Sequence, residues 1–206
     1  MAERPIALVL RHGEASDNAQ GIFRSWRDVP LTERGVAQAH LAADFIQNYP
    51  VTEIISSPLL RAFVTADIAA AKMGLRVFQH RGLFPWRLGI FSGLARKENQ
   101  DALHLFVENP GISIPEGESL ENFEARQFSF WSASLKMSRD RGMILFVCHN
   151  SVVTALVNLT LGARQVEAIA GENVKPGGVA EIYWDGKTHF VKPVYGTAET
   201  AQFGGS

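Results

Sequence analysis

A short stretch near the N-terminus, IALVLRHGE at positions 6–14, constrains the fold of this chain more than any other segment. Its first five residues are apolar and predict a buried strand, and charged residues follow at once. Arg11 and His12 therefore stand at the end of a strand, which is where open α/β sheets bind their ligands. Arginine offers phosphate a planar fork of donors, histidine can attack phosphorus or carry a proton, and Gly13 allows a close backbone approach. The stretch favours a phosphate site.

The composition is that of an ordinary globular protein. With 206 residues, 46% of them hydrophobic and 20% charged, the chain can bury a sizeable core in one domain. The net charge of −1 argues against a strongly basic nucleic-acid-binding protein, so no nucleic-acid partner is expected. Cys148 is the only cysteine, which excludes an intrachain disulfide and fits a reducing compartment.

The only apolar run at the N-terminus, residues 5–10, is too short for a signal peptide or a membrane span. We therefore expect a cytoplasmic protein without a membrane partner. The sequence leaves open whether the protein is a monomer or a homodimer.

Strands and helices alternate along most of the remaining chain. Apolar runs predict further strands at 52–56, 76–79, 143–148, 179–184 and 188–194, and the last two flank a hairpin signal. Helical spacing and capping residues predict helices at 33–48, 57–73, 119–139 and 151–161. This order predicts a three-layer α/β/α fold with a mainly parallel central sheet and a C-terminal antiparallel hairpin.

Residues 80–118 interrupt this alternation. They are rich in proline and glycine, so we expect them to be irregular. A loop of this length is usually functional. We therefore expect a single domain over residues 1–206, in which 80–118 form an irregular specificity or cap loop.

Two histidines, His12 and His149, each follow an apolar strand directly. If both strands are central and parallel, both side chains emerge at the same edge of the sheet. Arg11 precedes the first histidine, and Arg61 lies in the first turn of a helix that follows another strand, so it points to that edge too. Two arginines and two histidines around one point repel each other, which favours a dianionic ligand.

These residues lie in four motifs that occur in the order seen in the histidine phosphatase superfamily, and the chain resembles the phosphoglycerate-mutase-like branch of that family over roughly residues 6–160. The motifs are L-R-H-G-E at 10–14 with Asn18 and P-L-T-E-R-G at 30–35, S-S-P at 56–58 with Arg61, G-E-S at 117–119 with Arg126, and V-C-H at 147–149.

The resemblance implies a phosphohistidine mechanism. His12 would attack phosphorus in line and form a covalent intermediate, which water then hydrolyses. Arg11, Arg61 and His149 would hold the equatorial oxygens and stabilise charge in the transition state, and Asn18 would add a neutral donor.

Arg24 and Asn150 are further candidates for phosphate contacts, although surface charge explains Arg24 equally well. No cofactor and no metal are implied, because arginines neutralise the charge. The residues agree, since the sequence holds no H-x-x-x-H or C-x-x-C spacing for a metal.

The sequence departs from the family pattern at the general acid. The family usually places a Glu four residues before the first glycine of a G-x-x-x-G stretch, and here that stretch is 89–93 and the position is Pro85. A sister branch places an Asp directly after the second histidine, where this chain has Asn150. Neither residue can donate a proton as a carboxylic acid does.

Three explanations remain open. Either another carboxyl group has taken the role, or the substrate has a leaving group that needs little protonation, or the chain mainly binds phosphoesters. The carboxyl groups in predicted loops or motif ends are those of Glu14, Asp28, Glu98, Glu116 and Glu118. Glu118 is our first choice for the acid, although a helix N-terminus also explains a carboxylate there.

The sequence thus favours a metal-independent histidine phosphatase that acts on a small phosphorylated substrate. One alternative is a phosphoglycerate-type mutase, for which Arg87, Arg96 and Lys97 would supply extra cations. Another is a weakly active phosphoester-binding or interaction module.

Overall fold

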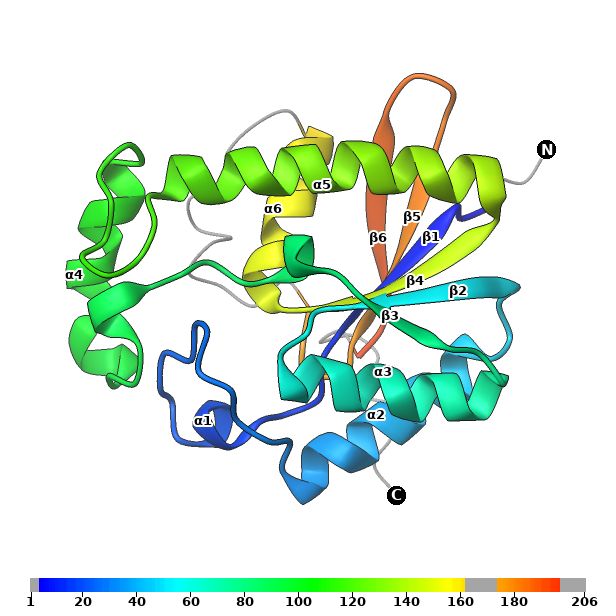
Figure 1. Ribbon diagram of the computed structural model, residues 1–206, viewed down its shortest axis with the longest axis horizontal. Helices are drawn as coiled ribbons and strands as arrows, with labels where there is room; N and C mark the ends of the chain where they lie inside the picture. The colour runs from blue at the N-terminus through cyan, green and yellow to red at the C-terminus, as the bar shows by residue number, and fades with distance from the viewer. Residues whose placement is uncertain (1–3, 162–173, 197–206) are drawn as a thin grey trace.

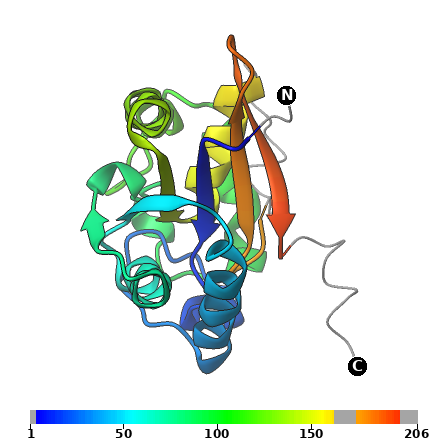
Figure 2. The same cartoon turned by 90° about the vertical axis from the view of Figure 1, so that its right-hand side faces the viewer.

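The computed structural model describes residues 4–161 and 174–196, and it places a six-stranded sheet between two layers of helices (Figure 1). The strands lie side by side in the order β3-β2-β4-β1-β5-β6 (Figure 2). Their bounds are β1 Ala7–Arg11, β2 Val51–Ser56, β3 Val77–Gln79, β4 Met143–Cys148, β5 Val179–Trp184 and β6 His189–Tyr195.

The first four strands in this order are parallel, and the last two are not. β1 pairs in parallel with β4, which pairs in parallel with β2, and β2 pairs in parallel with β3. β5 runs antiparallel to β1, and β6 runs antiparallel to β5. The predicted fold class, a mainly parallel sheet with a C-terminal antiparallel hairpin, is confirmed.

The helices begin and end close to the predicted positions. Thr32 caps one helix by accepting a hydrogen bond from the Gly35 amide, and Ser119 caps another by accepting from the Asn122 amide. The bounds are α1 Ser16–Ala19, α2 Glu33–Ile46, α3 Leu60–Met73, α4 Arg96–Glu108, α5 Leu120–Arg141 and α6 Asn150–Leu161, with short 3₁₀ helices η1 Arg81–Leu83 and η2 Gly89–Phe91.

The alternation of side chains along β1 explains why helices cover both faces of the sheet. Val9 packs into a cluster with α5 and α6, whereas Leu8 and Leu10 pack into a second cluster with α2 and α3. All three side chains are almost completely buried. A central strand that is apolar on both faces requires two helical layers, and this keeps the ends of β1 and β4 in the interior.

The expectation of an irregular segment over 80–118 is wrong at residues 96–108, where α4 forms. Leu103 and Val107 lie one helical turn apart and face a small separate core. This core, which we call the cap core, joins the segment to the chain after β1 and to the start of α5. Its buried residues are Phe23, Trp86, Leu88, Phe91, Val107, Ile114, Leu120, Phe123 and Ala155.

In the ranges 4–161 and 174–196, none of the helices combines the length and the hydropathy that crossing a bilayer requires.

Candidate active site

Two neighbouring strands, β1 and β4, end side by side and bring His12 next to His149. Arg11 lies opposite Cys148 in the parallel register, and the His12 amide donates to the Cys148 carbonyl at 3.0 Å. The two imidazole rings stand edge to face, with their centroids 5.1 Å apart. The structure therefore brings together two histidines that the sequence separates widely.

His12 is held in one orientation. Its Nδ1 lies 2.6 Å from the Gly13 carbonyl oxygen, and since a carbonyl can only accept, the ring hydrogen belongs on Nδ1. Nε2 is buried and receives no hydrogen bond from a described residue. The ring therefore presents a nitrogen with its lone pair available.

Gly13 is required where the chain turns away from β1. A Cβ added at Gly13 would lie 2.2 Å from the carbonyl oxygen of Gly35 in α2, so no other residue fits this close approach. The Gly13 amide donates to Thr65 Oγ1 at 3.1 Å, and the Thr65 hydroxyl donates to the Arg61 carbonyl at 2.7 Å. These contacts fix the turn against α3.

Arg61 joins α3 to the segment after β1. Its Nη1 donates to the Arg27 carbonyl at 2.8 Å and its Nη2 to the Ser25 carbonyl at 2.9 Å, while Nε is buried without a partner among the described residues. Ser25 has a positive φ of 52°, and its hydroxyl accepts from the Leu88 amide at 2.8 Å. The guanidinium thus stabilises a strained turn as well as adding charge to the site.

Arg24 and Arg11 add two more buried guanidinium groups. Arg24 is 7% exposed, and its Nη1 is buried without a hydrogen-bond partner in the described part of the chain. Arg11 is completely buried, and its Nη1 donates to the Val174 carbonyl at 2.7 Å and lies 3.5 Å from Asn150 Oδ1. Arg24 is therefore a buried residue rather than a surface charge.

The ionisation of the site follows from this burial. Loss of hydration lowers the pKa of His12 and of His149 well below the usual value, and the charges of Arg24 and Arg61 lower the pKa of both further. Burial also lowers the pKa of Arg24 and of Arg61. Both histidines are neutral at pH 7, and the cationic cluster is a favourable place for an anion.

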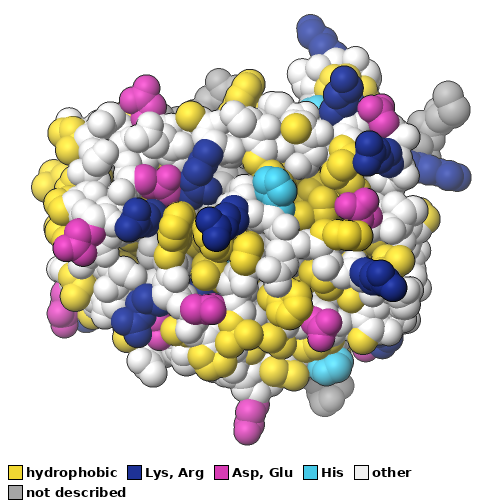
Figure 3. Space-filling view, in the orientation of Figure 1, with side chains coloured by type: hydrophobic (Ala, Val, Ile, Leu, Met, Phe, Trp, Pro, Cys, Tyr) yellow, Lys and Arg dark blue, Asp and Glu magenta, His cyan; other side chains and the backbone are white. Residues whose placement is uncertain are grey.

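The face of the molecule in Figure 3 does not share this concentration of charge. On the face in Figure 3, basic and acidic side chains are interspersed and form no large patch of one sign. The cations of the site lie inside the molecule.

A cavity of about 210 Å³ opens beside His149, between the sheet and the cap core. One wall is apolar and contains Phe23, Pro85, Trp86, Leu88, Leu103 and Val107. The other residues are polar or charged and are Arg24, Ser25, Arg61, Arg96, Gln100, His104, His149, Asn150 and Ser151. The mixture suits a molecule with an anionic end and an apolar body.

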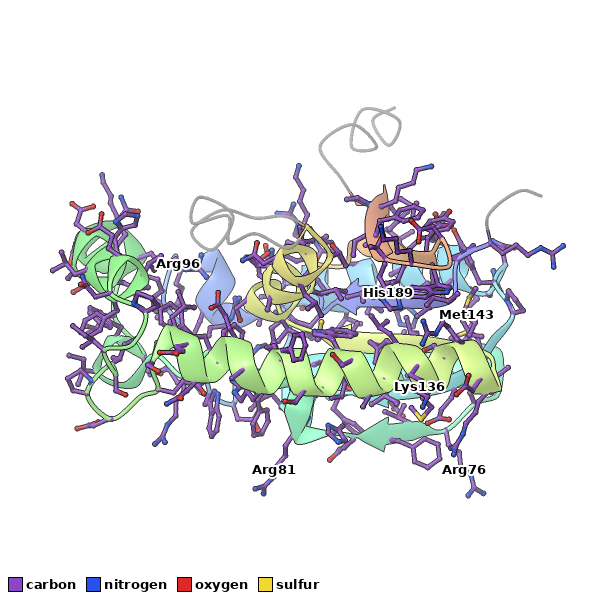
Figure 4. The ribbon with its side chains drawn as sticks, turned by 90° about the horizontal axis from the view of Figure 1, so that it is seen from above. Arg76, Arg81, Arg96, Lys136, Met143 and His189 are labelled. Atoms are coloured by element: carbon purple, nitrogen blue, oxygen red, sulfur yellow. The ribbon has the colours of Figure 1, made fainter. Side chains whose placement is uncertain are left out.

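α4 supplies part of this wall. Arg96 lies at the start of α4, on the side of the segment after β1 (Figure 4), and its guanidinium carbon stands 5.5 Å from the centre of the Phe23 ring. Gln100 and His104 follow at successive turns and also line the cavity. His104 carries no motif, and only the position of α4 reveals that it faces the cavity.

Glu118, our first choice for the acid, is held by other contacts. Its Oε1 accepts from Arg126 Nη2 at 2.7 Å and from the Arg87 amide at 2.9 Å, and its Oε2 accepts from Arg126 Nε at 3.0 Å. Glu118 is not one of the residues that line the cavity. The acid role stays a prediction, and these contacts give the carboxylate a structural role in anchoring the cap.

Pro85 does line the cavity, at the position where relatives are expected to carry the acid. Its carbonyl accepts from Arg126 Nη2 at 2.8 Å and from Trp26 Nε1 at 2.9 Å, so the backbone here is firmly held. Among the residues that the structure describes, the lining contains no Asp or Glu.

Three further residues support the site and were not among the site residues predicted from the sequence. Ser57, Ser25 and Thr65 contact His149, Arg61 and Gly13 respectively. Ser57 lies in the S-S-P motif, but a motif cannot tell which serine faces the histidine. The side chain of Asn18 lies outside the described residues. Within the described ranges, no group of three or more His, Cys, Asp or Glu side chains is arranged to hold a metal ion.

Comparison with known proteins places the chain among related sequences. The model of the histidine phosphatase superfamily (branch 1) matches residues 7–194. A probable phosphoglycerate mutase from Yersinia pestis is 32% identical over 159 residues, which are 75% of this chain and 74% of the relative.

Solved structures of other proteins share the fold of this chain along most of its length. The protein TTHB049 from Thermus thermophilus is 27% identical with a TM-score of 0.69, and the match covers 91% of this chain and 98% of that protein. A mycobacterial glucosyl-3-phosphoglycerate phosphatase is 25% identical with a TM-score of 0.75, over 93% of this chain and 98% of that one.

Proposed function

Because this chain belongs to the histidine phosphatase superfamily (branch 1), we propose that it hydrolyses a small phosphomonoester through a phosphohistidine on His12. The orientation of His12 carries the proposal, since Nδ1 donates to the Gly13 carbonyl and the buried Nε2 keeps its lone pair. The lowered pKa of His12 keeps the ring neutral at pH 7. A neutral nitrogen of this kind is the nucleophile that attack on phosphorus requires.

The reaction has two steps. His12 Nε2 attacks phosphorus, the new P–N bond forms, and the P–O bond to the leaving group breaks with its electron pair going to oxygen. The leaving oxygen then takes a proton from solvent. Water attacks the phosphohistidine, the P–N bond breaks, and phosphate leaves with the proton of water passing to solvent, which returns His12 to its neutral form.

The surrounding cations stabilise the charge that develops on the phosphoryl oxygens. Arg11, Arg24 and Arg61 are all buried, and their pairing with a dianion would replace mutual repulsion by attraction. Because these groups are already fixed, they need no reorganisation during the reaction. This neutralisation by arginines is why we propose a metal-independent enzyme.

The cavity supports a substrate with an apolar body. Phe23, Trp86 and Leu88 form part of its wall, and Pro85, which also lines the cavity, stands where the resemblance to the family implies an acid. A positioned general acid contributes roughly 10²–10⁴ in rate. We therefore expect an ester whose leaving group is itself acidic, such as a phenol, to be hydrolysed faster than an alkyl ester.

The test compares p-nitrophenyl phosphate with a panel of alkyl phosphates. Wild type is expected to turn over the aryl ester, and His12→Ala is expected to lose that activity. His40→Ala, which changes an exposed histidine on α2, is the matched control. Rapid quenching into alkali followed by mass spectrometry is expected to find phosphate on His12, and an unchanged rate in His12→Ala would exclude the mechanism.

A phosphoglycerate-type mutase is the second candidate. The relative from Yersinia pestis with 32% identity is described as a probable phosphoglycerate mutase, and Arg96 adds a further cation to the cavity. Incubation with 3-phosphoglycerate distinguishes the two activities. A mutase produces 2-phosphoglycerate, a phosphatase releases inorganic phosphate, and tight phosphate binding without either product would favour a binding module.

A further inference from the structure

A buried serine contacts the second histidine of the site. Ser57 Oγ lies 2.8 Å from His149 Nε2, and the two residues are 0% and 3% exposed. His149 lines the cavity, and its other ring nitrogen, Nδ1, is buried without a partner among the described residues. The contact with Ser57 therefore decides which nitrogen of His149 carries the hydrogen.

The other contact of Ser57 indicates the direction of this hydrogen bond. Ser57 Oγ already accepts from the Leu59 amide, at 3.4 Å, just before α3 begins. In the described part of the chain, His149 Nε2 is the one acceptor within reach of the hydroxyl hydrogen. If Nε2 were the donor instead, the buried hydroxyl hydrogen would lose this acceptor, which is unfavourable.

We propose that Ser57 is a positioning residue whose hydroxyl donates to His149 Nε2, so that the ring hydrogen lies on Nδ1 and His149 acts as a donor to the transferring phosphoryl group. The inference rests on the proposed phosphatase function. It assigns Ser57 a part in catalysis although Ser57 does not itself touch the substrate.

This arrangement gives two similar rings different chemistry. Both His12 and His149 carry hydrogen on Nδ1, but a different ring nitrogen of each makes the hydrogen bond that holds it in place. His12 is anchored through Nδ1 and offers bare Nε2, whereas His149 is anchored through Nε2 and offers Nδ1–H. A bare nitrogen on His149 would repel phosphoryl oxygens, so the tautomer matters in the transition state.

The direct test is nuclear magnetic resonance of protein labelled with ¹⁵N in histidine. Correlation of the ring nitrogens with the carbon-bound ring hydrogens identifies the protonated nitrogen, and the spectrum of His149→Asn assigns the signals. We expect hydrogen on Nδ1 of His149 in wild type and a shift toward Nε2 in Ser57→Ala. Hydrogen on Nε2 in wild type would overturn the proposal.

Steady-state kinetics of matched variants test whether the Ser57 hydroxyl contributes to catalysis. We expect Ser57→Ala to lower kcat about tenfold to a hundredfold with little change in KM, because the lost donor acts mainly in the transition state. Ser57→Thr keeps the hydroxyl and is expected to restore most of the rate. Ser56→Ala is the control, since Ser56 is equally buried but its hydroxyl donates to the Ser57 carbonyl.

The two proposals fail in different ways. Absence of turnover in wild type would refute the phosphatase function, and the tautomer of His149 would still be read directly from the spectrum. A normal kcat in Ser57→Ala, or a Ser57→Thr variant as slow as Ser57→Ala with an intact thermal unfolding profile, would refute the role of Ser57 while leaving the phosphatase function standing.

Discussion

The rings of His12 and His149 stand edge to face, with their planes inclined by 62°, at the ends of two adjacent parallel strands. Three buried arginines, Arg11, Arg24 and Arg61, lower the pKa of both rings in addition to the loss of hydration. The fold therefore contains two imidazoles that resist protonation, and this has a measurable effect on stability.

We expect the protein to become less stable as the pH falls below about 6.5, the pKa of histidine in an unfolded chain. The folded pKa of both rings is lower, so between the two values the unfolded chain binds more protons and the free energy of unfolding decreases as the pH falls. Urea denaturation at a series of pH values measures this. His12→Gln should make the dependence shallower, and His40→Gln, at an exposed position, should not.

Replacing Arg24 should raise the stability of the ligand-free protein while lowering its affinity for phosphate. Arg24→Met removes a buried charge that is surrounded by other guanidinium groups, so we expect the ligand-free protein to gain about 1 kcal/mol. The affinity for inorganic phosphate should fall about tenfold, because a charge-assisted contact is lost. Arg76→Met, at an exposed site distant from Arg96 (Figure 4), is the control for both measurements. A variant that binds phosphate as wild type does would contradict the role of Arg24.

Arg61→Lys should weaken both the fold and the activity. A lysine cannot donate to the carbonyls of Ser25 and Arg27 with the same fork, and a buried carbonyl without a partner costs about 1–3 kcal/mol. We expect lower thermal stability together with a lower kcat. Arg34→Lys, in which the side chain is 76% exposed, should leave both unchanged. Equal stability of Arg61→Lys and wild type would show that the turn at Ser25 does not depend on Arg61.

Introducing a carboxyl group at position 85 should extend the range of substrates. Pro85 lines the cavity and its carbonyl contacts do not need the proline ring, so a glutamate can be introduced there. We expect Pro85→Glu to raise alkyl phosphate hydrolysis about tenfold while changing aryl phosphate hydrolysis little. Pro85→Gln has the same shape without the acid and should show no gain. If Pro85→Glu also shows none, the acid is supplied elsewhere.

Much of the fold could be predicted from the sequence, because the spacing of apolar residues and the helix-capping residues indicate the same helices and strands. The run at 143–148 is apolar throughout, as a strand between two helical layers must be, and it became β4. The family was also identified correctly, since its motifs occur in order along the chain. α4 was missed because prolines and glycines on both sides of it dominate the pattern, and its short apolar stripe faces the cap rather than the sheet.

The details of the site depend on contacts between distant residues, which no local pattern contains. Arg24 is equally compatible with a surface position in the sequence, and only the fold of the turn around Ser25 buries it. The pairing of Glu118 with Arg126 likewise depends on where α5 passes the loop at Phe84. The direction of the hydrogen bond at His149 can be inferred only when the position of Ser57 is known.

The route of the chain through the sheet has a consequence for how such a protein can change over evolutionary time. The chain leaves the sheet at Gln79 in the edge strand β3, builds the cap, and returns through α5 to the central strand β4. The cap therefore adds no strand to the sheet, and its length and sequence can vary without disturbing the pairing of β1 with β4. Descendants of one ancestor can thus inherit the same cluster of histidines and arginines at the ends of β1 and β4 and change what binds beside it by exchanging only the cap.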